Sequence, residues 1–284
     1  MLDIKFNLSF GKRLLLLFLI FIFCFIVVGV ISGLVLLKFE MTTPVLRILT
    51  VLQDVVMFLT PAVACAMLST RYPARLLAID RAPGLNATLT AIAALLVSMP
   101  AMNQLIALNE SMHLPESMAG LEQWIRAMED DAAAKMNIAI GAHNIPSLVM
   151  NILIIGVMAG VSEELFFRGA LQRLLSTRLG VHASVWTAAV IFSAVHMQFY
   201  GFVPRMLLGA FFGYALVWSG TLWLPVILHV ANNTIYLIAQ YRYGTPDIPE
   251  AGFSWTTVLI SLVSVVLTAV LLASMRRSCL KMRV

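Results

Sequence analysis

The run LLLLFLIFIFCFIVVGVISGLVLL at residues 14–37 decides the class of fold, because it carries no charge over a length that can cross a membrane. A helix needs roughly 20 mostly apolar residues to span the hydrocarbon layer of a bilayer. Lys12 and Arg13 come directly before the run. The run is too long for the core of a signal peptide and lacks an obvious small-residue cleavage site, so we expect a membrane anchor.

The rest of the chain continues this apolar pattern. Only 12% of the 284 residues are charged and 61% are hydrophobic, whereas roughly a quarter of the residues in a soluble domain are charged. The runs are continuous rather than alternating, which argues against a membrane β-barrel. We therefore expect an all-α fold, a polytopic transmembrane helix bundle of about eight spans. The seven further spans are expected at residues 48–68, 87–107, 146–167, 183–199, 206–218, 222–239 and 255–274.

Basic residues between the spans predict the orientation of the bundle, because cytoplasmic loops are enriched in Lys and Arg. With eight spans, four basic clusters fall on one side, so both termini are expected in the cytoplasm. The net charge of +5 then reflects topology, and we expect no nucleic-acid partner. The clusters are Lys5, Lys12 and Arg13; Arg71, Arg75 and Arg81; Arg168, Arg173 and Arg178; and Arg276, Arg277, Lys281 and Arg283.

A long polar stretch at residues 109–144 falls on the opposite side of the membrane. It holds six acidic and two basic residues, which gives a net charge of −4. We expect a solvated connection here. The alternative is a short amphipathic helix at residues 121–136, LEQWIRAMEDDAAAKM, lying on the outer surface.

Three acidic residues, Asp54, Glu163 and Glu164, lie inside apolar spans. A carboxylate in hydrocarbon is costly, so such residues usually face a cavity and serve a function. Arg168 follows Glu164 by four residues on the same helix face, so we expect these two to pair. Glu163 points about 100° away and is left available as a general base. For Asp54 we expect a structural role.

Two histidines, His196 and His229, lie within expected spans, and Asn233 follows His229 by one turn. Together with Glu163 they could gather around one water molecule, which the carboxylate would deprotonate while His and Asn donate to an oxyanion. Alternatively, Glu163, His196 and His229 could hold a divalent metal such as zinc. One detail conflicts with both readings, because Glu163 lies near the cytoplasmic end of its expected span, whereas His196 lies about 20 Å into the next.

Gly209 and Gly213 form a GxxxG pair in the span expected at residues 206–218. Such a pair lets a neighbouring helix approach closely, so we expect it to bring this span against its neighbours.

Three short motifs occur in order along the chain. Residues 163–168, EELFFR, fit EExxxR; residues 192–196, FSAVH, fit FxxxH; and residues 229–233, HVANN, fit HxxxN. With these motifs the chain resembles the CPBP family (CAAX protease and bacteriocin-processing, also called Abi), which comprises intramembrane proteases of glutamic or metallo type similar to the type II CAAX prenyl endopeptidases. The resemblance covers about residues 145–241, and the first three spans and the last carry no signature.

The resemblance implies a peptidase site that opens toward the cytoplasmic face of the membrane. Glu163 would activate water, and Glu164 and Arg168 would support it. His196, His229 and Asn233 would stabilise the oxyanion or help bind a metal. The implied substrate is a prenylated CAAX-type C-terminus or, in a bacterium, a membrane or secreted peptide. The expected location is the bacterial plasma membrane, as a multi-pass protein in contact with the lipid bilayer.

We divide the chain into residues 1–144 with spans one to three and the outer loop, residues 145–241 as the catalytic core, and residues 242–284 with the last span and basic tail. Two other function classes stay open. One is a non-proteolytic membrane scaffold or immunity protein of the same fold. The other is a proton-coupled transporter, which should show internal repeats that the sequence lacks. No HExxH or GxSG signature of another protease class is present.

Overall fold

The computed structural model describes residues 9–244 and 254–281, with side chains described to Cys279, and within these ranges the chain is helical without a strand. Lys5, Lys281 and Arg283 lie outside the described side chains. Among the described residues, six helices are long and apolar enough to cross a membrane, which confirms the expected helical bundle. The count of eight spans and the side of the termini stay predictions.

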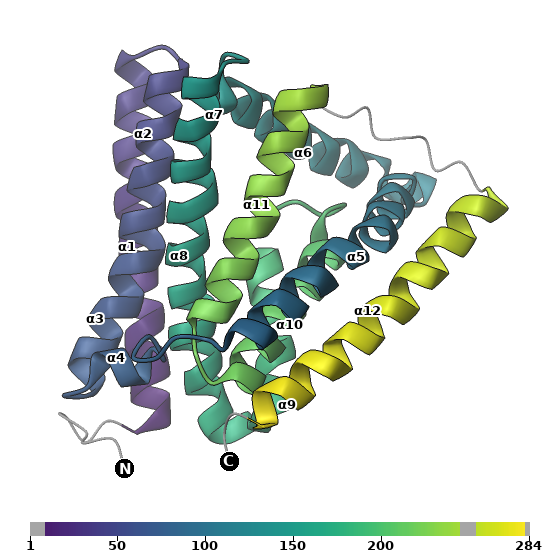
Figure 1. The fold of residues 1–284 in the computed structure, drawn as a ribbon. Coiled ribbons are helices and arrows are strands. Elements are labelled where there is room, and N and C mark those ends of the chain that lie inside the picture. Colours follow the sequence, from purple (N-terminus) through teal and green to yellow (C-terminus); the bar gives the residue numbers. More distant parts are fainter. Residues whose placement is uncertain (1–8, 245–253, 282–284) are drawn as a thin grey trace.

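The N-terminal part forms an antiparallel pair of rods (Figure 1). The first rod is α1, Phe10–Lys38. The second is one continuous helix made of α2 (Thr43–Gln53), a π-helical turn η1 (Asp54–Leu59) and α3 (Thr60–Ser69). A short helix α4, Pro73–Leu76, follows at the end of the bundle where α1 begins.

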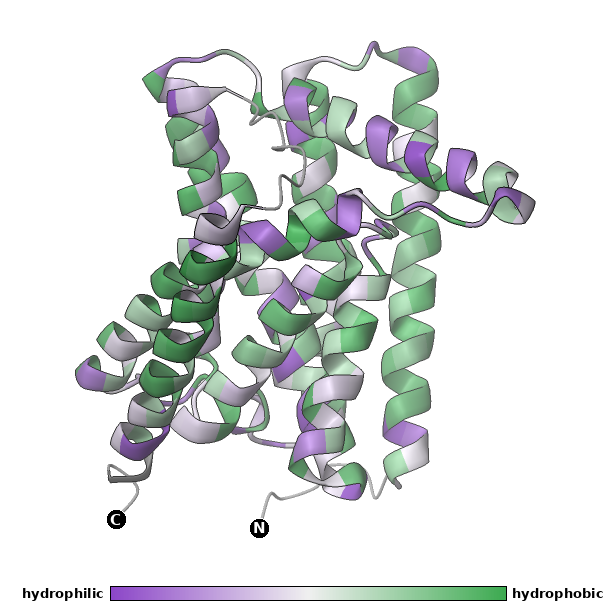
Figure 2. Cartoon of the chain, turned by 90° about the vertical axis from the view of Figure 1, so that its right-hand side faces the viewer, coloured by the Kyte–Doolittle hydropathy of each residue, from purple (hydrophilic) through white to green (hydrophobic). Residues whose placement is uncertain are grey.

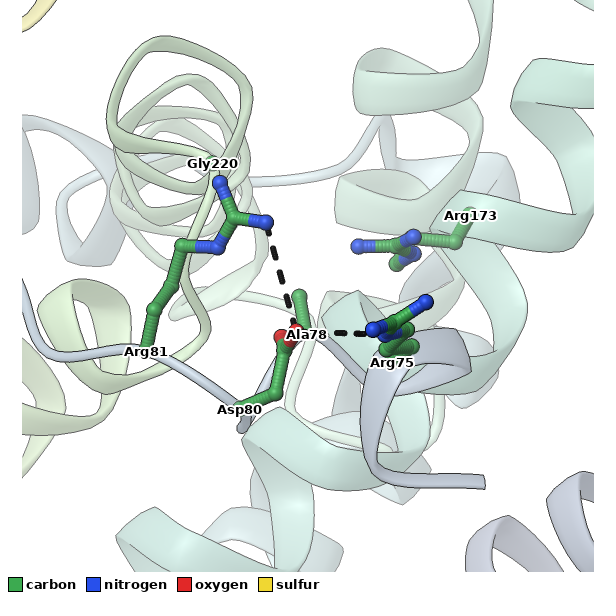
Figure 3. A pocket seen from close by; sticks show the side chains of 6 residues that line it. All are labelled: Arg75, Ala78, Asp80, Arg81, Arg173 and Gly220. Atoms are coloured by element: carbon green, nitrogen blue, oxygen red, sulfur yellow. Dashed lines mark ion pairs between the residues drawn. The ribbon is translucent and has the colours of Figure 1, made fainter. Parts of the chain in front are cut away.

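The turn after α4 borders a pocket at this end of the bundle. Its lining residues include Arg75 from α4, Asp80 and Arg81 from the turn, and Arg173 from a distant helix (Figure 3). The chain then enters α5, Leu85–Glu110, which packs along α12, Trp255–Lys281, at one side of the molecule (Figure 1).

The centre of the bundle is a helical rod that starts at Ile145. It consists of α7 (Ile145–Asn151), η3 (Ile152–Met158), α8 (Ala159–Glu164), η4 (Leu165–Gln172) and the first part of α9 (Arg173–Ala194). Helical geometry breaks only at Gly180, where φ is +74°, a value that glycine adopts without strain. The rod is therefore about 50 Å long, and the span expected to end near residue 167 in fact continues to residue 179.

Beyond Gly180 the chain turns back and forms a helical hairpin. The rings of Phe167 and Phe192, on opposite sides of the turn, lie 5.1 Å apart. α10 (Phe202–Ser219) and α11 (Trp223–Tyr243) complete the centre, with α11 packed against η3 and α8. α11 is not among the six apolar helices because His229, Asn232 and Asn233 interrupt its apolar face.

The polar stretch before the rod is largely helical, as in the alternative of an amphipathic helix, and most of its residues are exposed, as a solvated connection implies. η2 (Glu116–Met118) leads into α6 (Ala119–Ile140). α6 lies across the end of the bundle opposite α4 and carries several hydrophilic residues along its length (Figure 2). Arg47 fixes the C-terminal end of α6 by donating to the carbonyls of Ala139 and Ile140, an arrangement that satisfies free helix-end acceptors.

Candidate functional site

The hairpin at Gly180 removes the conflict in depth between Glu163 and His196. Glu163 lies 17 residues before Gly180 and His196 lies 16 residues after it. At the helical rise both are about 25 Å from the turn, so the two arms carry them to the same depth. The sequence-based estimate was wrong because it ended the fourth span about three turns too early.

A buried ion network forms the centre of the site. The Glu164 carboxylate, which is 0% exposed, accepts hydrogen bonds through Oε1 from Arg168 Nη1 at 2.8 Å and from His229 Nδ1 at 2.8 Å. The predicted pair of Glu164 with Arg168 is therefore present. Because Nδ1 of His229 faces a carboxylate, it carries the proton, and Nε2 of the same ring points to the other side.

Glu163 lies on that other side of His229. Its Oε2 is 3.8 Å from His229 Nε2, and its side chain is 13% exposed. This separation is too long for a direct hydrogen bond but suits a water molecule that contacts both groups. Glu163 thus differs from its neighbour, because no arginine within the described residues forms an ion pair with it.

Aromatic rings enclose the ion network. The Arg168 guanidinium lies 4.4 Å above the ring of Phe192 and 5.7 Å from that of Phe212. The same two rings contact His229 at centroid distances of 5.9 and 5.3 Å. Phe192, the first residue of the FxxxH motif, therefore shields the charges from lipid and holds the guanidinium by a cation–π contact.

Gly209 and Gly213 allow α10 to reach this network, as the GxxxG pair predicted. Arg168 Nη2 donates to the carbonyl of Gly209 at 2.9 Å, and Gln172 Nε2 donates to that of Gly213 at 3.1 Å. A Cβ at Gly209 would lie 3.0 Å from Arg168 Nη2, and a Cβ at Gly213 would lie 2.7 Å from Gln172 Oε1. The lack of a side chain at Gly209 and Gly213 thus leaves room for the buried side chains of Arg168 and Gln172.

His196 and Asn233 stand at the edge of this arrangement. The His196 ring contacts Phe192 at 5.0 Å, and its Nδ1 faces the Phe192 carbonyl at 2.8 Å. That bond leaves Nε2 for other partners. Asn233 Nδ2 donates to the carbonyl of Ile155 at 3.0 Å, so one of its two amide protons is used within the bundle.

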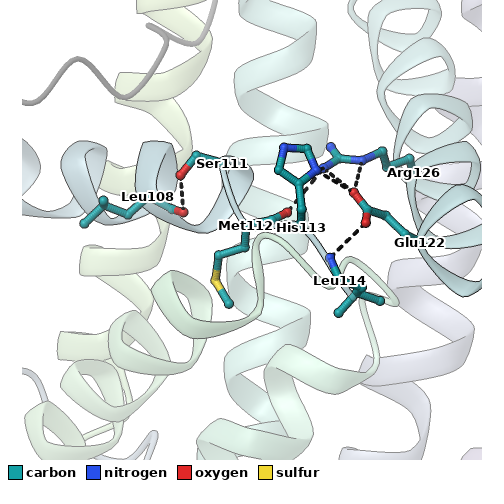
Figure 4. A network of polar contacts seen from close by, with 7 residues as sticks. All are labelled: Leu108, Ser111, Met112, His113, Leu114, Glu122 and Arg126. Atoms are coloured by element: carbon teal, nitrogen blue, oxygen red, sulfur yellow. Dashed lines mark hydrogen bonds and ion pairs between the residues drawn. The ribbon is translucent and has the colours of Figure 1, made fainter. Parts of the chain in front are cut away.

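The loop that follows His196 is held by α5 and α6. Tyr200 is the anchor, because its N–H donates to Glu129 Oε1 at 2.7 Å and its carbonyl accepts from Asn109 Nδ2 at 3.0 Å. The Arg126 guanidinium lies 4.6 Å above the Tyr200 ring. Figure 4 shows that Arg126 also joins His113 and Glu122 in a polar network at the start of α6.

Glu122 is the acceptor of that outer network. It receives hydrogen bonds from Arg126, from His113 Nδ1 at 2.9 Å and from the Leu114 N–H at 2.8 Å. These donors favour the charged carboxylate and lower the pKa of Glu122 to about 2. The network fixes α6 over the loop that carries His196.

Two residues near the site, Arg205 and Glu129, were not predicted from the sequence. Arg205, in the first turn of α10, folds back over Gly201 and donates to Gln198, while its buried Nη1 has no partner within the described residues. Glu129 lies 71 residues from the Tyr200 N–H that it binds. Neither had a motif to mark it. Asp54 was expected to have a structural role. Its Oδ2 is buried without a hydrogen-bond partner among the described residues, and its burial results from the packing of η1 against α8.

A metal ion would need three or more converging donors. In the ranges that the structure describes, no group of three or more His, Cys, Asp or Glu side chains is arranged to hold one. The set Glu163, His196 and His229 therefore does not fit a zinc site in this arrangement.

Residues 145–235 match the family model described as type II CAAX prenyl endopeptidase Rce1-like, which confirms the resemblance inferred from the motifs. This is a protease family, so the match supports a peptidase role in general terms. Two curated proteins are similar to the chain. One is the uncharacterized protein YpbD of Bacillus subtilis (strain 168), 25% identical over 99 residues, which are 34% of this chain and 48% of the relative. The other is an uncharacterized 24.3 kDa protein of Escherichia coli, 30% identical over 102 residues, which are 34% of this chain and 46% of the relative.

The chain thus spans about half the length of the two relatives it matches. No solved structure matches the chain.

Proposed function

We propose that the protein is an intramembrane endopeptidase in which Glu163 activates the attacking water. The observation that carries this proposal is the asymmetry of the two adjacent carboxylates. Glu164 is paired with Arg168 and His229, whereas the one ion-pair partner of Glu163 among the described residues is His229, with Nε2 at 3.8 Å. A carboxylate without an arginine partner, in a site of low dielectric, is suited to accept a proton.

In the proposed reaction, a water between Glu163 and His229 gives a proton to Glu163 as its oxygen bonds to the peptide carbonyl carbon. The resulting oxyanion accepts a hydrogen bond from Asn233, and from Nε2 of His229 or His196 when that ring carries a proton on both nitrogens. Glu163 then passes the proton to the amide nitrogen, and the C–N bond breaks. Glu164 and Arg168 act as positioning residues, because Glu164 fixes the proton on His229 Nδ1.

The depth of the site supports a substrate that enters the bilayer. Arg173 lies ten residues after Glu163 on the same rod, about 15 Å away, which is half the thickness of a hydrocarbon layer. We propose a membrane-embedded peptide substrate, either a prenylated CAAX-type C-terminus or a membrane or secreted peptide of a bacterium. The bacterial plasma membrane is the proposed location.

The test is cleavage of a library of membrane-inserted peptides by the purified protein, with products identified by mass spectrometry. We expect Glu163→Gln to lower the rate by about 10²- to 10⁴-fold, the usual contribution of a general base. Asp130→Asn, an exposed acid on α6, is the matched control and should leave the rate unchanged. A chelator should have no effect on the wild type, because the donor set does not fit a metal.

Two results would contradict the proposal. Chelator-sensitive cleavage that zinc restores would indicate a metal site built from a rearranged Glu163, His196 and His229. No cleavage of any peptide by the wild type would favour the non-proteolytic scaffold or immunity role.

A further inference from the structure

A pocket far from the proposed peptidase site combines three arginines with a single carboxylate. It has a volume of about 360 Å³ and lies between the turn after α4, the start of α9 and the turn before α11. Figure 3 shows Arg75, Arg81 and Arg173 around it, with Asp80 between the first two. Its lining thus carries a net charge of +2, in a pocket large enough for a small polar headgroup.

The one carboxylate does not neutralise the arginines. Asp80 Oδ2 is 4.0 Å from both Arg75 Nε and Arg81 Nη2, at the outer limit of an ion pair. Arg173 has no carboxylate within 4.0 Å among the described residues. Guanidinium groups with open donors on a shared pocket favour an oxyanion that they can bind together, and phosphate fits this geometry.

The backbone under the pocket is firmly built. The carbonyl of Ala78 accepts from the Leu222 N–H at 2.8 Å, that of Arg81 from Thr221 Oγ1 at 2.6 Å, and that of Ile79 from Trp223 Nε1 at 3.1 Å. These bonds tie the turn after α4 to the start of α11. The pocket is therefore held open by fixed main chain rather than by surface side chains alone.

The surroundings of the pocket point to a lipid as the source of the phosphate. Trp223 is 40% exposed beside the pocket, and tryptophan side chains mark the level of the lipid headgroups. The pocket lies at the end of the bundle where α1 begins and α12 ends, which holds the basic clusters (Figure 1). Basic pockets between membrane helices commonly hold anionic headgroups.

We propose that this pocket binds the phosphate of an anionic phospholipid headgroup through Arg75, Arg81 and Arg173. The bound headgroup bridges the α4 region and the start of α9, and it lies beside Gly220, so three segments of the chain meet at it. One of them begins the helix that carries His229, and another continues the helix that carries Glu163. The lipid therefore stabilises the base of the central helices, whether or not the protein cleaves peptides.

The experiment measures lipid binding to the full-length protein in detergent by native mass spectrometry. The probes are phosphatidylglycerol, phosphatidylcholine, inorganic phosphate and an acidic Glu-rich peptide. We expect phosphatidylglycerol to bind more tightly than phosphatidylcholine. Arg81→Gln and Arg173→Gln should each weaken it about fivefold, the effect of one basic residue at an anionic membrane surface. Arg178→Gln is the matched control, because Arg178 is exposed on the same helix as Arg173 but does not line the pocket.

Asp80→Asn is a further test, because it is expected to strengthen lipid binding, whereas a misfolded variant would bind lipid less well. It removes the one carboxylate of the pocket, so it should strengthen phosphatidylglycerol binding rather than weaken it. The proposal is overturned if Arg178→Gln weakens binding as much as Arg81→Gln does, because general surface charge would then explain the affinity. It is also overturned if the acidic peptide displaces the lipid and inorganic phosphate does not. Tight binding of inorganic phosphate alone would keep the phosphate site but assign it to a free ion.

Discussion

The protein contains the same trio of side chains twice, once in its core and once at its surface. In the core, Glu164 accepts from Arg168, four residues later, and from His229 Nδ1 at 2.8 Å. At the start of α6, Glu122 accepts from Arg126, also four residues later, and from His113 Nδ1 at 2.9 Å.

The two trios differ in burial rather than in bonding. The side chains of Glu164 and Arg168 are 0% exposed, whereas those of Arg126 and His113 are 39% and 75% exposed. Water can replace a lost partner in the outer trio but not in the inner one. Hydrogen bonds of the same geometry therefore contribute differently to folding stability, because removing one partner leaves an unpaired group that is buried in the inner trio and solvated in the outer one.

Breaking each trio at its arginine gives the largest expected contrast. Arg168→Met leaves the buried Glu164 carboxylate without its arginine partner and should destabilise the fold by about 3–5 kcal/mol. Arg126→Met removes the equivalent exposed partner and should cost about 0–1 kcal/mol. Thermal unfolding of both variants in the same detergent measures the difference. Equal losses of stability would show that burial does not separate the trios.

Filling the space beside the inner trio should have a smaller effect. Gly209→Ala puts a methyl group 3.0 Å from Arg168 Nη2 and 3.1 Å from Phe192 Cδ1, an overpacking worth about 1–3 kcal/mol. Gly29→Ala is the control, because nothing lies within 4 Å of its Cβ. The melting temperature should fall only for the first variant. If both variants melt alike, α10 does not approach Arg168 as closely as described.

Releasing the loop beside the outer trio should change motion more than stability. Glu129→Gln weakens the bond to the Tyr200 N–H by about 1 kcal/mol. Hydrogen exchange of residues 195–201 should become faster, whereas α8 should keep its protection. Glu116→Gln, an exposed acid before α6, provides the comparison. Unchanged exchange in the loop would mean that Asn109 and Arg126 hold Tyr200 without Glu129.

Protonation of Glu122 at acidic pH should weaken the outer trio, and we expect it to lower the stability of the fold less than any of the substitutions above. The pKa of Glu122 in the fold is about 2, below its ordinary value of 4.5. Its stabilising contribution is therefore complete above the ordinary value and is lost as the pH falls through 4.5 toward about 2. Melting temperatures measured from pH 7 to pH 3 should fall less steeply for Glu122→Gln than for the wild type. Parallel curves would exclude Glu122 as a source of acid sensitivity.

The features that could be predicted from the sequence are those that depend on the spacing of nearby residues. The apolar runs gave the helical bundle, the four-residue spacing gave the Glu164–Arg168 pair, and the GxxxG pair gave the close approach of α10. The length of the central rod was not predictable in this way, because Arg168 looked like the end of a span. In the structure its charge is neutralised inside the bundle, so the helix continues past it.

Long-range contacts escaped the sequence for a different reason. Glu129 and Tyr200 are 71 residues apart and neither belongs to a periodic pattern. α6 was only the alternative expectation from the sequence, and its contacts with Arg47 and Tyr200 fix it in the structure. Such contacts depend on the assembled bundle rather than on propensity.

The lengths of the two arms of the hairpin at Gly180 determine the level at which Glu163 and His196 meet. The two arms, of nearly equal residue count, set how far Glu163 and His196 stand above the turn. An insertion of one helical turn in a single arm would shift one residue past the other by about 5.4 Å and dismantle the constellation. The same insertion in both arms would keep the constellation and move it to another level of the bilayer. Relatives that act at different depths could therefore arise by paired changes in length, with no change at the reacting groups.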